Sequence, residues 1–200
     1  ETTGLFWAAT DRIIGVSVWT PSFAYYFPFR HASDNLPTSH LPPLLRELEL
    51  QYLVGYNIKF DLHHLRRDGM SWPRSVENAH LMSHLANENE ESFELKALSA
   101  KYLGIDSINE SLRLDALLVE RKLKKGELYK LAARDVSEYA IADARLALQL
   151  ADFQWRMLTA WKLVNIAHEL TEYEQLTFDM EERGLLLDVA AVQALEDRAT

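Results

Sequence analysis

The sequence contains no cysteine among its 200 residues. Disulfide bonds and thiolate metal sites are therefore excluded, and the composition is compatible with a reducing compartment. No apolar run approaches the roughly 18 residues that a membrane-spanning helix needs, so no membrane segment is predicted. The seven glycines form no phosphate-binding loop, which removes any sign of an ATP or dinucleotide site.

Positive charge is also scarce. The sequence has 21 Lys and Arg but 30 Asp and Glu, which gives a formal net charge of −9. Binding along a phosphate backbone requires a basic surface, so this balance argues against a general nucleic-acid coat protein. It leaves room for an enzyme that handles a short strand end through metal ions. The length suffices for one sizeable domain with a smaller appendage.

Local patterns predict an α/β fold. β-branched residues predict a strand over 12–19, and an aromatic run predicts its partner over 23–29. Early strands followed mainly by helices indicate a sheet that carries a cluster of functional residues at its strand ends. Further along we expect a loop at 31–43, a strand at 52–55, helices at 44–50, 58–67, 78–85, 94–103, 112–130 and 163–180, and a turn with a short strand at 181–188.

The most informative stretch is residues 135–150, which predict a helix with Asp135 as N-cap and Glu138 completing a capping box. Apolar residues recur along it at helical spacing, and Asp143 falls within this buried stripe one turn after Tyr139. A core-facing carboxylate is costly unless its charge is compensated. Two interpretations follow: a buried Asp bonded to backbone or paired with an Arg, or a metal ligand beside a phenol.

Further carboxylates lie where strands are predicted to end. Asp61 follows Asn57 by four residues, so both can share a face of the helix that starts there. Strand ends that lead into helices are where α/β sites collect. Carboxylates without His or Cys partners suit hard cations such as Mg²⁺ or Mn²⁺. Two such ions, roughly 3.5–4 Å apart, can activate a water and stabilise the leaving oxygen of a phosphodiester.

Three segments carry a family resemblance. Residues 1–5 (ETTGL), 57–61 (NIKFD) and 139–143 (YAIAD) resemble, in order and spacing, the three motifs of the 3′–5′ exonuclease (proofreading) domain of family A DNA polymerases. This is the tyrosine subtype of the DEDD superfamily. The resemblance covers about residues 1–155, and residues 172–188 resemble the entry to the polymerase domain that follows in that family.

The resemblance implies an RNase H-like fold, with a mixed central sheet flanked by helices, over residues 1–158. Residues 159–200 would be the helical start of the polymerase domain. The implied activity is removal of nucleotides from DNA 3′ ends by two-metal-ion hydrolysis, within a DNA-directed DNA polymerase that acts in replication or repair. We expect a monomer that binds a single-stranded primer end in the cytoplasm, at the nucleoid or in the host of a virus.

The resemblance also implies roles for individual residues. Glu1, Asp61 and Asp143 would hold two divalent ions, Mg²⁺ or Mn²⁺, and Tyr139 would orient the attacking water. Stacking and wedging contacts tolerate any sequence, and a mismatch makes strand separation less costly. The positions that match nucleic-acid contacts are Leu5 and Phe60, against the frayed bases, and Thr2 and Asn57, near the terminal nucleotide.

One departure concerns the first motif, in which the family places an Asp two residues before the Glu. This sequence starts at Glu1, without an initiator Met, so we expect a fragment whose true start lies upstream. Alone, such a fragment is expected to bind metal poorly and to show little exonuclease activity.

Two alternatives come from the same residues: a non-catalytic exonuclease-like scaffold of the polymerase, and a stand-alone RNA-trimming nuclease of the superfamily. The presence of all four expected catalytic residues argues against a decayed site. The polymerase-like continuation argues against a stand-alone nuclease, and Tyr139 argues against the histidine subtype.

Histidines and basic residues are assigned structural roles. His80 and His84 are one helical turn apart, but they lack a Glu base or a third ligand between or near them. The adjacent His63 and His64 diverge on a helix, so at most one could face the site. The basic residues within 121–134 are predicted to form a solvated helix face rather than a DNA contact.

Overall fold

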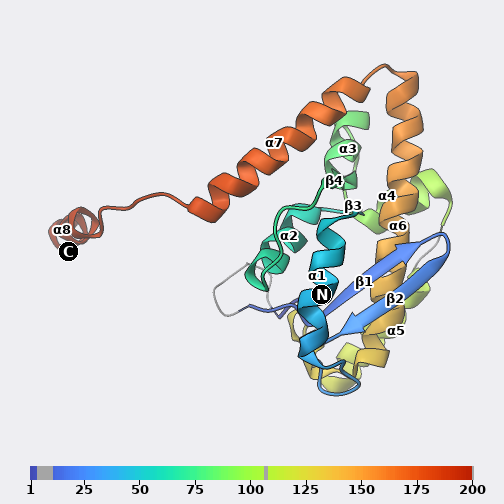
Figure 1. Cartoon of the computed structure of the whole chain (residues 1–200), viewed down its shortest axis with the longest axis horizontal. Helices are drawn as coiled ribbons and strands as arrows, with labels where there is room; N and C mark the ends of the chain where they lie inside the picture. Colours follow the sequence, from blue (N-terminus) through green and yellow to red (C-terminus); the bar gives the residue numbers. More distant parts are fainter. Residues whose placement is uncertain (4–10, 106–107, 200) are drawn as a thin grey trace.

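Helices surround two short β-ladders of opposite kinds, which gives the expected mixed α/β arrangement (Figure 1). Strand β1 (Gly15–Thr20) pairs antiparallel with β2 (Phe23–Pro28), and β3 (Tyr52–Gly55) pairs parallel with β4 (Ser75–Asn78). No helix within the described residues is both long and apolar enough to cross a lipid bilayer. The computed structural model describes residues 1–3, 11–105 and 108–199.

Helix α6 is the central support of the domain, because it contacts β1, β2, β3, α3, α4 and α5 along its length (Figure 1). Side chains of α1 and α2 share a core cluster with Val16, Val18 and Phe27 of the first ladder, and α8 extends away from the domain beyond α7. The helical elements are η1 (Thr38–His40), α1 (Leu41–Glu49), α2 (Ile58–Arg67), α3 (Ala79–Ala86), α4 (Leu95–Leu103), α5 (Ile108–Arg121), η2 (Lys125–Lys130), α6 (Ala133–Ala160), α7 (Val164–Arg183) and α8 (Val189–Ala199).

The segment that leads into β1 separates two buried clusters. Side chains alternate across an extended chain, so the neighbours Ile13 and Ile14 face opposite sides. Ile13 packs with residues of α1 and α2, and Ile14 packs with residues of α5, η2 and α6. Both are buried, at 2% and 0% exposed. The extended segment at the N-terminus is thereby fixed between the helices that carry the later motifs.

Several helix boundaries differ from the predictions. Helix α1 starts at Leu41 and includes two prolines that we assigned to a loop, because the first helical turn tolerates residues without an N–H. Helix α6 starts at Ala133 with Ala132 as N-cap, so the predicted capping box is wrong. Asp135 lies in the first turn, where a negative charge interacts favourably with the helix dipole.

Other predicted elements are divided or missed. The helix predicted at 112–130 is two pieces, since α5 ends at Arg121 and Lys122 has a left-handed φ of 55°. Strand β4 is missed because its sequence, SVEN, is short and has only one apolar residue. The strand predicted at 181–188 is wrong: α7 continues to Arg183, and residues 184–188 form no strand.

The expected single central sheet is not confirmed. The described strands form two separate two-stranded ladders, joined to no common sheet. Next to the first ladder, Thr2 and Ile13 form an isolated antiparallel bridge. An antiparallel and a parallel pair are both present, as a mixed sheet requires, but the RNase H-like assignment stays a proposal.

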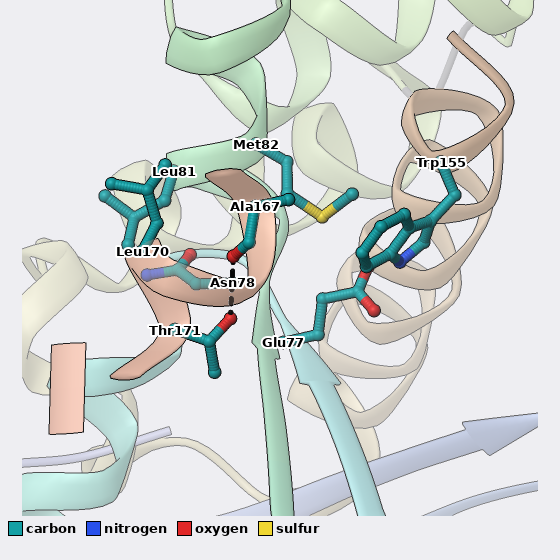
Figure 2. A pocket seen from close by; sticks show the side chains of 8 residues that line it. All are labelled: Glu77, Asn78, Leu81, Met82, Trp155, Ala167, Leu170 and Thr171. Atoms are coloured by element: carbon teal, nitrogen blue, oxygen red, sulfur yellow. Dashed lines mark hydrogen bonds between the residues drawn. The ribbon is translucent and has the colours of Figure 1, made fainter. Parts of the chain in front are cut away.

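Helix α7 closes a small cavity against β4, α3 and α6 (Figure 2). Its volume is about 10 Å³, roughly that needed by one water. Glu77 and Trp155 line it from β4 and α6, and on α7 the Thr171 hydroxyl donates to the Ala167 carbonyl at 3.2 Å. Glu77 is 3% exposed, its Oε2 accepts a hydrogen bond from the Tyr52 hydroxyl, and its Oε1 has no partner among the described residues.

Burial raises the pKa of Glu77 from 4.5 to about 7, although the nearby Trp155 indole opposes the rise. The native state therefore holds this proton more tightly than the unfolded chain does. The contribution of Glu77 to the free energy of unfolding is most favourable below pH 4.5 and decreases as pH rises to 7.

Replacing Glu77 with Gln should remove this part of the pH dependence, because Gln stays neutral. Wild-type protein should lose roughly 3 kcal/mol of stability between pH 4.5 and pH 7 that the variant keeps. Urea denaturation across this pH range measures the difference. The exposed Glu88→Gln serves as control, and parallel pH profiles for wild type and Glu77→Gln would contradict the prediction.

Candidate functional site

A tight turn between β3 and α2 positions Asp61. Gly55 ends β3, and a Cβ at this position would lie 2.8–2.9 Å from atoms of Ile58, so only glycine fits without a shift. Asn57 then takes a left-handed conformation (φ 57°, ψ 40°), which Asn tolerates better than most residues. Its backbone N–H donates to Asn78 Oδ1 at 2.9 Å. The turn starts α2 at Ile58 and places Asp61 in its first turn, as predicted.

Asp61 is exposed, although many protein atoms lie in the neighbourhood of its carboxylate. Partial loss of hydration there raises its pKa. The terminal ammonium of the chain opposes this rise, and the carboxylate of Glu1 adds to it. Glu1 and Asp61, which are 60 positions apart in the sequence, therefore lie within electrostatic reach of each other.

Backbone pairing places Glu1 and Thr2 beside the strand segment that precedes β1. The terminal ammonium of Glu1 donates to the Gly15 carbonyl at 2.9 Å, and the Ile14 N–H donates to the Glu1 carbonyl at 2.9 Å. Thr3 and Arg12 exchange two further hydrogen bonds, one through the Thr3 hydroxyl. Residues 1–3 of the first motif are thus paired with the segment before β1, and residues 4 and 5 lie outside the described residues.

Helix α6 carries Tyr139 and Asp143 one turn apart, both half-buried. Burial raises the pKa of the Tyr139 phenol above its usual range, and the carboxylates of Asp143 and Glu1 add to the rise. Burial also raises the pKa of Asp143. Lys96 and the Tyr139 hydroxyl oppose this rise, and the carboxylate of Glu1 adds to it. Glu1 therefore acts on all three of the other predicted catalytic residues.

Lys96 on α4 is a further member of the site, and the sequence did not point to it. Its Nζ lies 3.4 Å from Asp143 Oδ1 and 4.2 Å from the centre of the Tyr139 ring, and it donates to Ser111 Oγ. Asp143 thus has the cationic partner that is expected of a buried carboxylate, but the partner is Lys rather than Arg. On an isolated helix Lys96 looks like any surface lysine; only the packing of α4 on α6 brings it here.

Three of the four predicted nucleic-acid contacts, Thr2, Asn57 and Phe60, lie within the described residues. Asn57 is exposed and Phe60 is half-buried, with its ring 4.8 Å from that of His64 in an edge-to-face arrangement. Thr2 is half-buried beside Ile13. Leu5 lies outside the described residues. The accessible positions at the start of α2 are thus next to Asp61 along one helix.

The carboxylates suit hard divalent cations by their chemistry, since every donor is oxygen. Asp143 Oδ1 is buried and forms an ion pair with Lys96 Nζ at 3.4 Å, so Lys96 is the cation beside this oxygen. No three His, Asp or Glu side chains are grouped as ligands of one ion within residues 1–3, 11–105 and 108–199. Side-chain movement, including that of Lys96, would have to precede shared metal binding.

The basic residues around η2 are largely paired with acidic neighbours. Lys130 Nζ lies 2.5 Å from Glu127, and Lys125 Nζ lies 3.7 Å from Asp115. These pairs are solvent-exposed, which agrees with the predicted solvated face.

Comparison with known proteins identifies the family. The family model described as 3′–5′ exonuclease matches residues 1–159, which is most of the chain. The chain belongs to this 3′–5′ exonuclease family. The match includes the segments of Glu1, Asp61, Tyr139 and Asp143, so the three resembling motifs all lie within the exonuclease region.

Phage DNA polymerases are among the relatives of this exonuclease. The chain is 32% identical over 162 residues to DNA polymerase DpoZ of Salmonella phage PMBT28, covering 78% of the chain and 25% of the relative. It is 28% identical over 205 residues to DNA polymerase DpoZ of Acinetobacter phage SH-Ab 15497, covering 94% of the chain and 30% of the relative. It is 26% identical over 178 residues to a DNA-directed DNA polymerase of Pseudomonas phage M6, covering 86% of the chain and 26% of the relative. The chain spans less than a third of the length of each of these relatives.

Replacing Lys96 with Met should raise the pKa of Asp143 further, because the ammonium now opposes the effect of burial. A carboxyl ¹³C NMR titration with assigned Asp resonances measures this. Lys101→Met, on the same helix but paired with Glu90, is the matched control. An unchanged or lowered Asp143 pKa in Lys96→Met would show that the contact with Lys96 does not act on the carboxylate.

Proposed function

We propose that this chain is the proofreading domain of a family A DNA-directed DNA polymerase. It removes nucleotides from DNA 3′ ends during replication or repair, by two-metal-ion hydrolysis. The observation that supports this most strongly is the electrostatic coupling of Glu1 to Asp61, Tyr139 and Asp143 across three separate segments. The family match over residues 1–159 and the polymerase relatives support the same activity.

In this proposal Glu1, Asp61 and Asp143 hold two Mg²⁺ or Mn²⁺ ions. Bound ions supply an activated water and stabilise the leaving oxygen of the phosphodiester. The Tyr139 hydroxyl orients that water, and the raised phenol pKa keeps it protonated as a hydrogen-bond donor. Burial is the main cause of the raised pKa values of Asp61 and Asp143, and the carboxylate of Glu1 adds to both, so a bound cation would favour their charged forms.

The substrate in this proposal is the single-stranded 3′ end of a primer. Thr2 and Asn57 contact the terminal nucleotide, and Leu5 and Phe60 pack against its bases. Stacking on an apolar ring does not depend on base identity, which suits removal of any mismatch. The exposed position of Asn57 and the half-buried ring of Phe60 leave both accessible to a strand end.

We further propose that residues 1–158 have the RNase H-like fold and that residues 159–200 begin the polymerase domain. The apolar side chains of Leu185, Leu186 and Leu187 are exposed after α7, as expected of a segment that packs against further protein. The protein would act as a monomer in the cytoplasm, at the nucleoid or within a phage-infected host.

A non-catalytic scaffold is the second candidate. The pairing of Lys96 with Asp143 and the absence of a grouped three-ligand set among the described residues favour it. The two candidates differ in whether the carboxylates are needed for digestion of a 3′ end.

Asp143→Asn in the full-length protein should reduce removal of a mismatched 3′ nucleotide by roughly 100-fold or more, because it removes a ligand charge at the reacting phosphate. Tyr139→Phe should reduce it less. Digestion of a labelled mismatched primer–template with and without Mg²⁺ measures the rates, and extension of a matched primer is the control. Equal digestion by wild type and Asp143→Asn would refute the proposed mechanism.

The chain that starts at Glu1 should digest a labelled single-stranded oligonucleotide slowly in Mg²⁺, because the family's first-motif Asp is not part of it. Adding Asp-Ala before Glu1 should increase the rate and tighten Mn²⁺ binding, and adding Asn-Ala should do neither. Rapid Mg²⁺-dependent digestion by the chain without the addition would contradict this expectation.

A further inference from the structure

Helix α7 lies beyond the residues that the exonuclease family model matches, yet it packs on the helix that carries Asp61. Glu174, Phe178 and Glu181 recur at helical spacing and share one face of α7. Glu174 and Phe178 are 5% and 3% exposed, and Phe178 belongs to the cluster that includes α1 and α2 side chains. This face of α7 is therefore an integral part of the domain interior.

The first connection runs from Glu174 through Asn78 to Asn57. The Asn78 Nδ2 donates to Glu174 Oε1, and its Oδ1 accepts from the backbone N–H groups of Asn57 at 2.9 Å and His80 at 3.0 Å. Because the amide oxygen already accepts two bonds, its nitrogen must face Glu174. The side chain of Asn78 is thus oriented from both ends, and Asn57 is fixed in its left-handed conformation.

In the second connection, two acidic residues of α7 contact α2 on both sides of Asp61. His63 is 0% exposed, with Nε2 2.7 Å from Glu181 and Nδ1 2.5 Å from Glu182. Lys59 Nζ lies 2.8 Å from Glu181 Oε1. Lys59 and His63 are two residues before and two after Asp61, so α7 contacts the helix on either side of the predicted metal ligand.

The burial of Glu174 is costly for stability. Its Oε2 accepts no hydrogen bond from the described residues, and burial raises its pKa, with Asn78 opposing the rise. An apolar residue in the same place would avoid this desolvation cost. Stability alone therefore does not explain a carboxylate at position 174. Its hydrogen bond to Asn78 does, because Asn78 orients the turn at Asn57.

We propose that Glu174 is a positioning residue of the exonuclease site, acting through Asn78 on the turn at Asn57. Helix α7 then belongs to the nuclease unit, although it follows the matched exonuclease region. The inference rests on the proposed function, in which Asn57 contacts the terminal nucleotide and Asp61 holds metal.

The experiment compares Glu174→Leu, Glu174→Gln and the exposed control Glu172→Leu in the full-length protein. Leu cannot accept the Asn78 hydrogen bond, whereas the amide oxygen of Gln can. Glu174→Leu should raise KM for a single-stranded 3′ end roughly tenfold, with a smaller change in kcat, because the turn that binds the nucleotide is displaced. Glu174→Gln and Glu172→Leu should stay near wild type.

Two further measurements separate positioning from a structural role. Thermal unfolding of Glu174→Leu should change little, because removal of the buried carboxylate offsets the loss of the acceptor for Asn78 Nδ2. Hydrogen exchange in the peptide spanning residues 52–60 should become roughly tenfold faster in this variant and not in Glu174→Gln.

A wild-type KM together with unchanged exchange in Glu174→Leu would overturn the inference, as would a loss of activity that matches a loss of stability. Failure of the proposed function looks different: wild type and Asp143→Asn would then digest the strand end equally.

Discussion

Partial burial of acidic side chains, with added repulsion from the carboxylate of Glu1, is the constraint around which this site is arranged. Glu1, Asp61 and Asp143 come from distant segments, and each additional negative charge makes ionisation of the others harder. Lys96 compensates part of this charge by lying beside Asp143 and over the Tyr139 ring. A protein that only needed stability would avoid such a cluster. Its retention within a 3′–5′ exonuclease domain is understandable if cations complete it.

The rest of the fold holds these acidic segments in place. Helix α6 passes along both ladders and carries Tyr139 and Asp143, and the buried pair Ile13 and Ile14 fixes the strand beside Glu1. The turn at Asn57 fixes the start of α2. Each motif is therefore attached to a buried element and not to a free loop, which limits the movement of its side chains.

Helix α7 joins the exonuclease region to whatever follows it in the chain. Its inner face contacts α2 and β4 through the buried Phe178 and Glu174 and the exposed Glu181, whereas its far end leads to exposed apolar residues. The same helix thus has one face toward the site and one end that leads to exposed apolar residues. A boundary drawn at the end of α6 would separate Asp61 from the residues that support its helix.

The sequence by itself determined the α/β class, the β1–β2 hairpin, helices such as α2 and α4, and the three motif segments. These depend on local spacing, capping and turn residues, which act over a few positions. It did not reveal the Lys96–Asp143 pair, the Asn78 bridge or strand β4. In the sequence, Lys96, Asn78 and Glu174 look like ordinary polar residues. Packing places Lys96 beside Asp143 and Asn78 beside Glu174. Only the tertiary structure decided these contacts, because partners so far apart in the chain leave no periodic signal.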